Sequence, residues 1–395
     1  MVCCWNLIFF ISPFITTLGY LGTLSSVSAS SDCNFPYPKH YTAYHLNAGE
    51  IINVDGKVDE DAWSKVAWTD EFMDIQGPSF PKPRFTTRAK MRWDENYLYI
   101  AAFMEETDVW ANQTKHDSVI FYDNDFEVFI DPSGSTHFYK EFEMNAINTT
   151  WDLELNKPYL NGGTPNSSWE MPTMKTATFV DGPVNDPLVK NTYWTAEIAM
   201  PFKDLIHGKT GMRAPPKNGD QWRINFSRVE WHVRVVNGHY EKVPNIREDN
   251  WVWSSQNAIN MHLPERWGFL LFSKEAVNQT TYTKYPDWNV YYALTQVYNA
   301  EKAFAAVNGY FTDVLDQLNL PSSITQGKCA KIPKVDVPKF QTSKFNVTVS
   351  PLVSGAPIGH ISDDRLIWFE ESKIKSLFLV KICRLFNLSL CQALS

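Results

Sequence analysis

The sequence predicts a mainly β protein, an antiparallel β-sandwich or jelly roll that continues into a helical C-terminal extension. Between residues 51 and 272, many short segments alternate apolar and polar side chains, and Gly, Pro, Asn and Asp separate them. That alternation is the period of a half-buried strand. The spacing of a long amphipathic helix first occurs beyond residue 286. Many short strands without interleaved helices favour packed sheets.

The clearest alternation lies in residues 121–131 and resumes in residues 138–145. The segment Pro132-Ser133-Gly134 between them predicts a turn, so the two strands should pair. Their apolar side chains then share one face. The opposite face should be a polar surface edged by aromatic rings, which would hold Tyr122, Asp123, Glu127, Glu143 and Asn145. Carboxylates and amides beside aromatic rings suit a sugar, whose hydroxyls need hydrogen-bond partners.

Apolar residues recur at helical spacing in residues 287–306, with Asp287 as the expected N-cap and Asn308-Gly309 as the expected stop. A second short helix is predicted over residues 312–318, and two strands over residues 345–353 and 360–369. We therefore divide the chain as follows: signal peptide (1–29), Pro-rich lead-in (30–47), β-sandwich (48–273), helical extension (282–320), and linker, short strands and apolar C-terminal tail (321–395).

The N-terminal apolar run is interrupted by Pro13 and ends at Val27-Ser28-Ala29, which resembles a signal-peptide cleavage site. The C-terminal apolar tail carries Lys381 and Arg384, so stable membrane insertion is not expected. We predict a secreted, extracellular glycoprotein with attachment sites at Asn112, Asn148, Asn166, Asn278 and Asn346.

Four cysteines remain after removal of the signal peptide: Cys33, Cys329, Cys383 and Cys391. They allow three pairings, and the sequence does not choose among them. A bond between Cys33 and Cys329 would tie the mature N-terminus to the region after the main domain.

The net charge of -8 excludes nucleic acid as the main partner, because a phosphate-binding face needs clustered Lys and Arg. The chain is rich in aromatic residues, with 15 Trp, 17 Tyr and 25 Phe. Most of these rings should lie in the core, but their number leaves some to serve a binding face.

Six motifs in order resemble the family 9 carbohydrate-binding modules, best known as appendages of xylanases. The resemblance covers roughly residues 48–272. It rests on Val54-Asp55-Gly56 with Trp63, Leu98-Tyr99-Ile100, residues 125–131, residues 194–202, residues 222–228, and Pro264-Glu265-Arg266-Trp267-Gly268. The resemblance implies a β-sandwich that binds sugars, often at glycan ends, between aromatic rings.

Carried over residue by residue, the resemblance places the family's strand carboxylate on Glu127 and its amide on Asn145. One clamp ring falls nearest Tyr122, and the second falls at Trp253 or near Met261. An arginine that the family has near the amide is replaced by Glu143. From its place at the end of the Trp222 strand, we add Arg228 as a hydrogen-bonding residue.

Structural calcium is also usual in that family. Two acidic groups offer the oxygen ligands that calcium requires: the turn that contains Asp55 and Asp59, and the set Asp123, Asp125 and Asp131.

We expect a glycan-binding protein that recognises oligo- or polysaccharide, and we assign no catalytic residue. One alternative is a glycan-hydrolysing enzyme, or an accessory domain in carbohydrate catabolism, since paired carboxylates could cleave a glycosidic bond. Another is an extracellular interaction domain that has lost sugar binding. The motifs of metalloproteases, serine hydrolases and phosphate-binding loops do not occur in the sequence. The sequence leaves the oligomeric state open.

Overall fold

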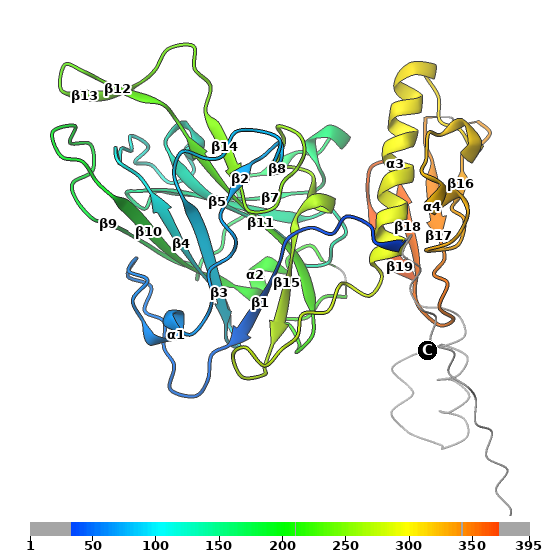
Figure 1. Cartoon of the computed structure of the whole chain (residues 1–395), viewed down its shortest axis with the longest axis horizontal. Coiled ribbons are helices and arrows are strands. Elements are labelled where there is room, and N and C mark those ends of the chain that lie inside the picture. Colours follow the sequence, from blue (N-terminus) through cyan, green and yellow to red (C-terminus); the bar gives the residue numbers. More distant parts are fainter. Residues whose placement is uncertain (1–32, 210, 341–342, 371–395) are drawn as a thin grey trace, which may run out of the picture.

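The computed structural model describes residues 33–209, 211–340 and 343–370 (Figure 1). A large curled sheet occupies most of the molecule, and a smaller unit built on one long helix stands beside it. The predicted signal peptide and the apolar tail lie outside the described residues. Within the described residues, no helix combines the length and hydropathy that are needed to cross a membrane.

Thirteen strands form the large sheet. They are β1 (His40–His45), β2 (Met73–Asp74), β3 (Thr87–Trp93), β4 (Tyr97–Glu105), β5 (Asp125–Asp131), β6 (Tyr139–Asn145), β7 (Thr150–Leu155), β8 (Pro165–Asn166), β9 (Lys175–Val180), β10 (Tyr193–Pro201), β11 (Gln221–Glu230), β14 (Asp249–Val252) and β15 (Gly268–Ser273).

The strands follow one another in the order β8-β7-β6-β5-β11-β15-β1-β3-β4-β10-β9, and β14 and β2 continue from β11. The prediction of a mainly β fold is confirmed. The antiparallel prediction holds for the sheet except at β1, which pairs in parallel with both β15 and β3. The sheet is therefore mixed. This strand lies inside the predicted lead-in, so the folded sheet begins earlier than residue 48.

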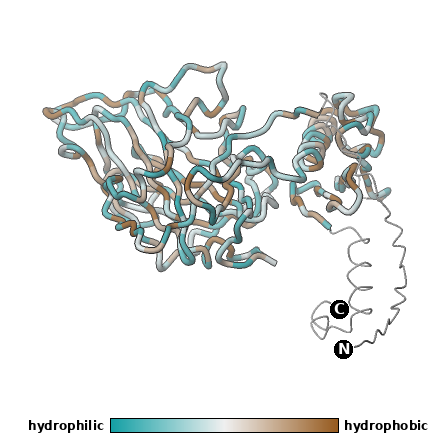
Figure 2. Tube along the Cα trace, turned by 60° about the horizontal axis from the view of Figure 1, so that its bottom comes forward, coloured by the Kyte–Doolittle hydropathy of each residue, from teal (hydrophilic) through white to brown (hydrophobic). Residues whose placement is uncertain are grey.

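The two halves of the sheet share one core. Met91 and Ile100 from β3 and β4 belong to the same cluster of buried side chains as Phe126 and Phe142 from β5 and β6. A flat sheet could not bring these side chains together, so the sheet curls over its apolar face. Hydrophilic and hydrophobic residues are interspersed throughout the sheet (Figure 2), and they alternate most clearly along β5 and β6, as the sequence predicts.

Short elements connect and flank the strands. They are the helices α1 (Asp61–Ser64) and α2 (Phe202–Leu205), the single turns of 3₁₀ helix η2 (Ile120–Tyr122), η3 (Tyr159–Asn161) and η4 (Pro264–Arg266), and the hairpin β12 (Val233–Val236) and β13 (His239–Lys242). Three of the connections, η2, η3 and the segment before η4, border the polar face of β5, β6 and β7.

The C-terminal unit is built on α3 (Trp288–Asn308), which begins after Asp287 and ends at Gly309, as predicted. Gly309 has a left-handed backbone, with φ of 77°. The helix packs on a small antiparallel sheet and is followed by two short turns. These elements are η5 (Leu315–Gln317), α4 (Ser322–Thr325), β16 (Lys334–Asp336), β17 (Asn346–Val349), β18 (Ile358–Ser362) and β19 (Ile367–Glu370).

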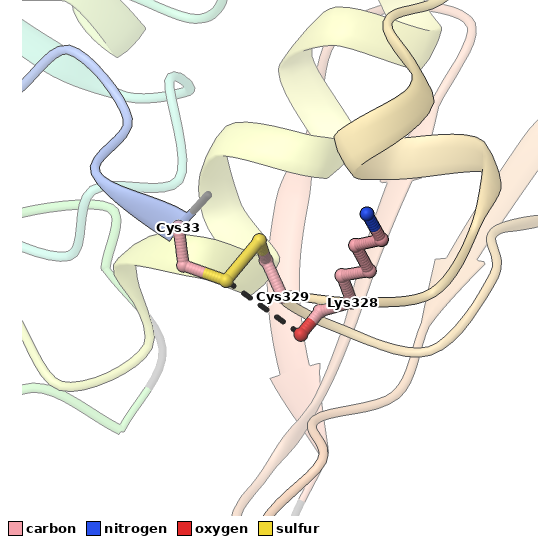
Figure 3. The surroundings of a disulfide bond; sticks show 3 residues. All are labelled: Cys33, Lys328 and Cys329. Carbon is pink, nitrogen blue, oxygen red and sulfur yellow. Dashed lines mark hydrogen bonds between the residues drawn. A yellow bond between two sulfur atoms is a disulfide. The ribbon is translucent and has the colours of Figure 1, made fainter. Parts of the chain in front are cut away.

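The C-terminal unit is docked on the large sheet by aromatic packing and by one disulfide. Phe269 of β15 lies in the same buried cluster as Trp288 and Tyr291 of α3. A disulfide joins Cys33 to Cys329 and so ties the N-terminal segment to the C-terminal unit (Figure 3). This is one of the pairings that the sequence left open.

Candidate functional site

A cleft of about 390 Å³ opens on the outward face of β5, β6 and β7, opposite the main core. This face exists because strand residues alternate: Phe126, Val128 and Ile130 enter the core, and the residues between them point the other way. The cleft is lined by Ile75, Phe121, Glu127, Phe129, Glu141, Glu143, Trp151, Leu153, Tyr159, Val229, Glu248, Asn250, Ile259, Asn260, Met261 and His262. Somewhat larger cavities lie where the C-terminal unit meets the sheet.

The floor of the cleft carries three glutamates from neighbouring strands. Glu127 of β5 lies directly opposite Glu143 of β6, and Glu141 lies two residues earlier on the same face of β6. Asp125 precedes Glu127 by two residues on the same face of β5 and is more deeply buried. All four side chains are buried, with at most 6% of any of these residues exposed. We call these four residues the carboxylate floor.

The carboxylate floor is electrostatically crowded. Within the described part of the chain, no Lys, Arg or His forms an ion pair with any of its four members. Burial raises the pKa of Glu127 to about 7. Burial, and then the charges of Glu127 and its neighbours, raise the pKa of Glu143 well above its usual range. Such groups act as hydrogen-bond donors when protonated and as acceptors when ionised.

Three aromatic side chains from different elements line the cleft. Trp151 of β7 lies directly opposite Glu143, Phe121 is the middle residue of η2, and Tyr159 belongs to η3. Phe121 and Tyr159 are 36% and 42% exposed, so their faces are available to a ligand. Rings beside carboxyl groups form a surface that contacts both the C–H face and the hydroxyl groups of a sugar.

Uncharged polar groups complete the far wall. Asn250 belongs to β14, and Asn260 and His262 belong to the segment that follows it. The His262 ring packs edge-on against Tyr159, with ring centroids 4.5 Å apart, and its Nδ1 lies 2.9 Å from the Tyr139 hydroxyl. Burial lowers the pKa of His262 to about 4, so its imidazole is uncharged at physiological pH.

The predicted sugar-binding residues do not all meet in the cleft. Glu127 lies in its floor. Tyr122 is 53% exposed and follows Phe121 in η2, but its ring lies near the Lys242 ammonium, 5.4 Å from the ring centroid, outside the cleft lining. Asn145 is fully buried; its amide donates to Asp123 and Gln113 and accepts from the Thr149 amide. Asn145 therefore braces the turn behind the floor.

Arg228 and Trp253 are held in the interior. The Arg228 guanidinium is fully buried and pairs with Glu106 at 3.0 Å and Glu230 at 2.8 Å. Trp253 is 1% exposed and belongs to the main core. The structure thus places neither side chain where it contacts a ligand in the cleft. Met261, the other position considered for the second ring, does line the cleft.

The predicted calcium ligands also separate. Asp55 and Asp59 are exposed on the turn before α1, and the Asp55 carboxylate accepts from the Lys57 amide. Asp131 is paired with Lys209 at 2.6 Å and caps the turn that follows β5. Asp123 uses Oδ2 to accept three hydrogen bonds from the Asn112 and Gln113 amides and the Asn145 side chain. Of the five, only Asp125 joins a group that could hold one ion, and its partners are Glu127 and Glu143.

A second such group lies on the surface beside β7. The Nε2 atom of His116 is 3.4 Å from an Asp117 oxygen and 4.0 Å from an Asp152 oxygen. Glu170 also lies 3.2 Å from this nitrogen. Burial is the main cause of the raised pKa of Asp152, about 6.

Sequence reasoning missed most of the cleft walls. It assigned no role to Phe121, Trp151, Tyr159, Asn250 or Asn260. One signal was present: Trp151 opens an alternating segment one short turn after β6, so pairing would place it beside Glu143. A second was the long loop of residues 156–171, which contains Tyr159 and which its length marks as functional or mobile.

Residues 54–229 match the family model described as carbohydrate family 9 binding domain-like. No curated protein matches the chain.

Three solved structures are similar at low identity. A carbohydrate binding module family 9 from Caldicellulosiruptor kristjanssonii in complex with cellotriose is 15% identical, with a TM-score of 0.38. A family 9 module from the same organism in complex with glucose is 16% identical, with a TM-score of 0.37. Both matches cover 62% of this chain and 100% of the module. A putative carbohydrate-binding protein from Bacteroides uniformis is 14% identical, with a TM-score of 0.44, and covers 60% of this chain and 100% of its own. These values are too low to transfer a ligand to this chain.

Proposed function

We propose that this protein binds carbohydrate in the cleft on β5, β6 and β7, since residues 54–229 match the carbohydrate family 9 binding domain-like model. The proposal rests on one observation: aromatic rings that are accessible to a ligand and buried carboxyl groups line the same cleft on one face of the sheet. Phe121, Trp151 and Tyr159 offer stacking surfaces, while Glu127 and Glu143 offer hydrogen bonds to hydroxyls.

The dimensions of the cleft favour a short ligand. Its volume of about 390 Å³ is near the lower end of ligand sites in proteins. Loop residues 259–262 and Tyr159 line it together with the strands. We therefore propose that the cleft takes the end of a glycan chain or a short oligosaccharide.

We propose that the protein works outside the cell as a glycoprotein. The Cys33–Cys329 disulfide supports an oxidising compartment. The side chains of Asn112, Asn148, Asn166, Asn278 and Asn346 are exposed, as glycan attachment requires, whereas Asn225, which also lies in a glycosylation sequence, is fully buried.

The test is a glycan array probed with the full-length secreted protein, followed by titration of the best ligand. We expect Trp151→Ala and Tyr159→Ala each to weaken binding roughly five- to thirtyfold, because each removes a stacking face worth roughly 1 to 2 kcal/mol. Tyr310→Ala is the matched control, since Tyr310 is 47% exposed on the C-terminal unit. Silence across the array from folded protein would instead support an extracellular interaction domain.

The floor also supports a second candidate function, glycan hydrolysis. Glu127 and Glu143 lie on adjacent strands, and they offer carboxylate oxygens within 4.8 Å of each other. Retaining glycosidases place their two carboxyl groups at about 5–5.5 Å. Incubating the bound glycan with the wild-type protein decides between the two functions: product release that Glu127→Gln abolishes would indicate an enzyme, and an intact glycan would leave a binding protein.

A further inference from the structure

The carboxylate floor has the geometry of a cation site. Asp125, Glu127 and Glu143 each offer one oxygen, and these three oxygens all lie within 4.8 Å of one another. Calcium binds oxygen at about 2.4 Å, so two ligands on opposite sides of one ion are at most about 4.8 Å apart. An ion placed between the three oxygens can lie within about 2.8 Å of all of them, so small side-chain adjustments, without movement of the strands, would bring each oxygen to bonding distance.

Unpartnered oxygens point to a ligand independently of this spacing. Asp125 is fully buried, and its Oδ2 atom has no hydrogen-bond partner. Glu141, 6% exposed and also lining the cleft, has an unpartnered Oε2 atom. A buried acceptor without a partner costs about 1–3 kcal/mol, and more if it is charged. The unpartnered Asp125 oxygen belongs to the three-carboxylate group itself, so its lone pairs are available to an ion bound there.

The absence of basic partners for these carboxylates, among the described residues, also favours a bound cation. Several buried acidic groups elsewhere in the interior have basic partners: Arg228 pairs with Glu106 and Glu230, and Lys209 pairs with Asp131. The four members of the carboxylate floor form no such pair among the described residues. Buried charges in proteins are paired or coordinate metals.

We propose that the carboxylate floor binds one divalent cation, with Asp125, Glu127 and Glu143 as ligands and Glu141 beside it. An all-oxygen set favours calcium over zinc or copper, which prefer nitrogen and sulfur ligands. Asp125 lies deeper than the two glutamates, so the ion would sit on the cleft floor with its open side toward the cleft. Coordination of sugar hydroxyls by this ion is an extension that rests on the proposed function.

The experiment uses the full-length protein, stripped with a chelator and then supplied with calcium, magnesium or zinc in the absence of sugar. We expect one calcium per chain by elemental analysis and a rise in melting temperature of roughly 5 °C at saturating calcium. Glu143→Gln and Asp125→Asn should each remove both effects, and Glu141→Gln should weaken them. Glutamine and asparagine keep the shape and remove a crowded charge, so the stripped variants should still fold.

The second acidic group supplies the matched control. Asp117→Asn changes a carboxylate beside His116, away from the cleft, and should leave the calcium response intact. The proposal is overturned if the stripped wild-type protein neither binds calcium nor gains stability from it. It is also overturned if Asp117→Asn, rather than Glu143→Gln, abolishes the response. Occupancy is measured without sugar, so neither result depends on whether glycans bind.

Discussion

Glu197 of β10 connects two segments that lie far apart in the sequence. Its Oε2 atom accepts hydrogen bonds from the Asp55 and Gly56 amides at 3.0 and 2.9 Å, and its Oε1 atom accepts one from Trp63 Nε1 at 2.7 Å. The opening motif of the domain is therefore held to β10 by one buried side chain. These motif residues therefore help to build the fold, and they do not line the cleft.

Gly56 provides a test at the scale of one residue. It has φ of 90°, and an added Cβ atom would lie 2.3 Å from the backbone carbon of Thr178. Gly56→Ala should lower the free energy of unfolding by about 3 kcal/mol or more, because it adds a clash to the left-handed strain. Gly49→Ala is the control: Gly49 has φ of 88° but open space around it, so only about 1 kcal/mol is expected. Equal losses by urea unfolding would show that the Thr178 contact is unimportant.

Residue-scale prediction from the sequence succeeded where alternation alone decides the answer. Glu127 and Glu143 were expected on one polar face, and the structure pairs them there. Alternation does not tell how deeply a face is covered, and for that reason Asn145 and Arg228 were expected at a surface although both are fully buried. Trp253 was expected as a ring that stacks on the sugar, but it is buried, because Gly268 of β15 has no side chain and so leaves room for the Trp253 ring in the core.

At the scale of elements, α3 was the most predictable part of the chain. Its apolar residues recur at helical spacing, and Asp287 and Gly309 mark its two ends. All three are local features of the sequence. The parallel strand β1 was not predicted, because its partners β15 and β3 come from distant parts of the chain. A short strand that is specified by non-local pairing leaves little local signal.

Glu301 makes the stability of α3 depend on pH. The residue is buried on the helix, with Oε2 accepting from the Thr312 amide and Oε1 unpartnered. Burial, with a smaller contribution from Asp313, raises its pKa to about 7. Since the folded pKa lies above the unfolded value of 4.5, its contribution to stability is full below pH 4.5 and is lost as pH rises through 7.

We therefore expect Glu301→Gln to stabilise the protein at pH 8.5 by roughly 1–2 kcal/mol relative to wild type, and by much less at pH 5. Thermal unfolding at the two pH values measures the difference. The contributions of the other titrating groups to the pH dependence of stability cancel in this comparison, because those groups are the same in both proteins. Glu275→Gln, an exposed position, should give no such pH-dependent gain. A gain from Glu301→Gln that is equal at both pH values would contradict the assignment.

At the scale of the whole molecule, the N-terminal segment and the C-terminal unit form one continuous structure with the sheet. Phe35 stacks on Tyr292 with centroids 4.3 Å apart, and Tyr37 stacks on Phe269 at 5.2 Å. The sequence could predict the helix and strands of this unit but not where they dock, since docking depends on contacts between surfaces that no local pattern records. The cysteine pairing was undetermined for the same reason.

The disulfide should stabilise this arrangement mainly by restricting the unfolded chain, because Cys33 and Cys329 are 296 positions apart. We expect Cys33→Ser with Cys329→Ser to lower the free energy of unfolding by about 2–4 kcal/mol. The cleft on β5, β6 and β7 involves neither cysteine, so its binding properties should persist under native conditions. Chemical unfolding with and without a reductant provides the check: reduction should lower the wild-type midpoint toward that of the variant. If the variant and the oxidised wild type unfold at the same denaturant concentration, aromatic packing alone holds the unit in place.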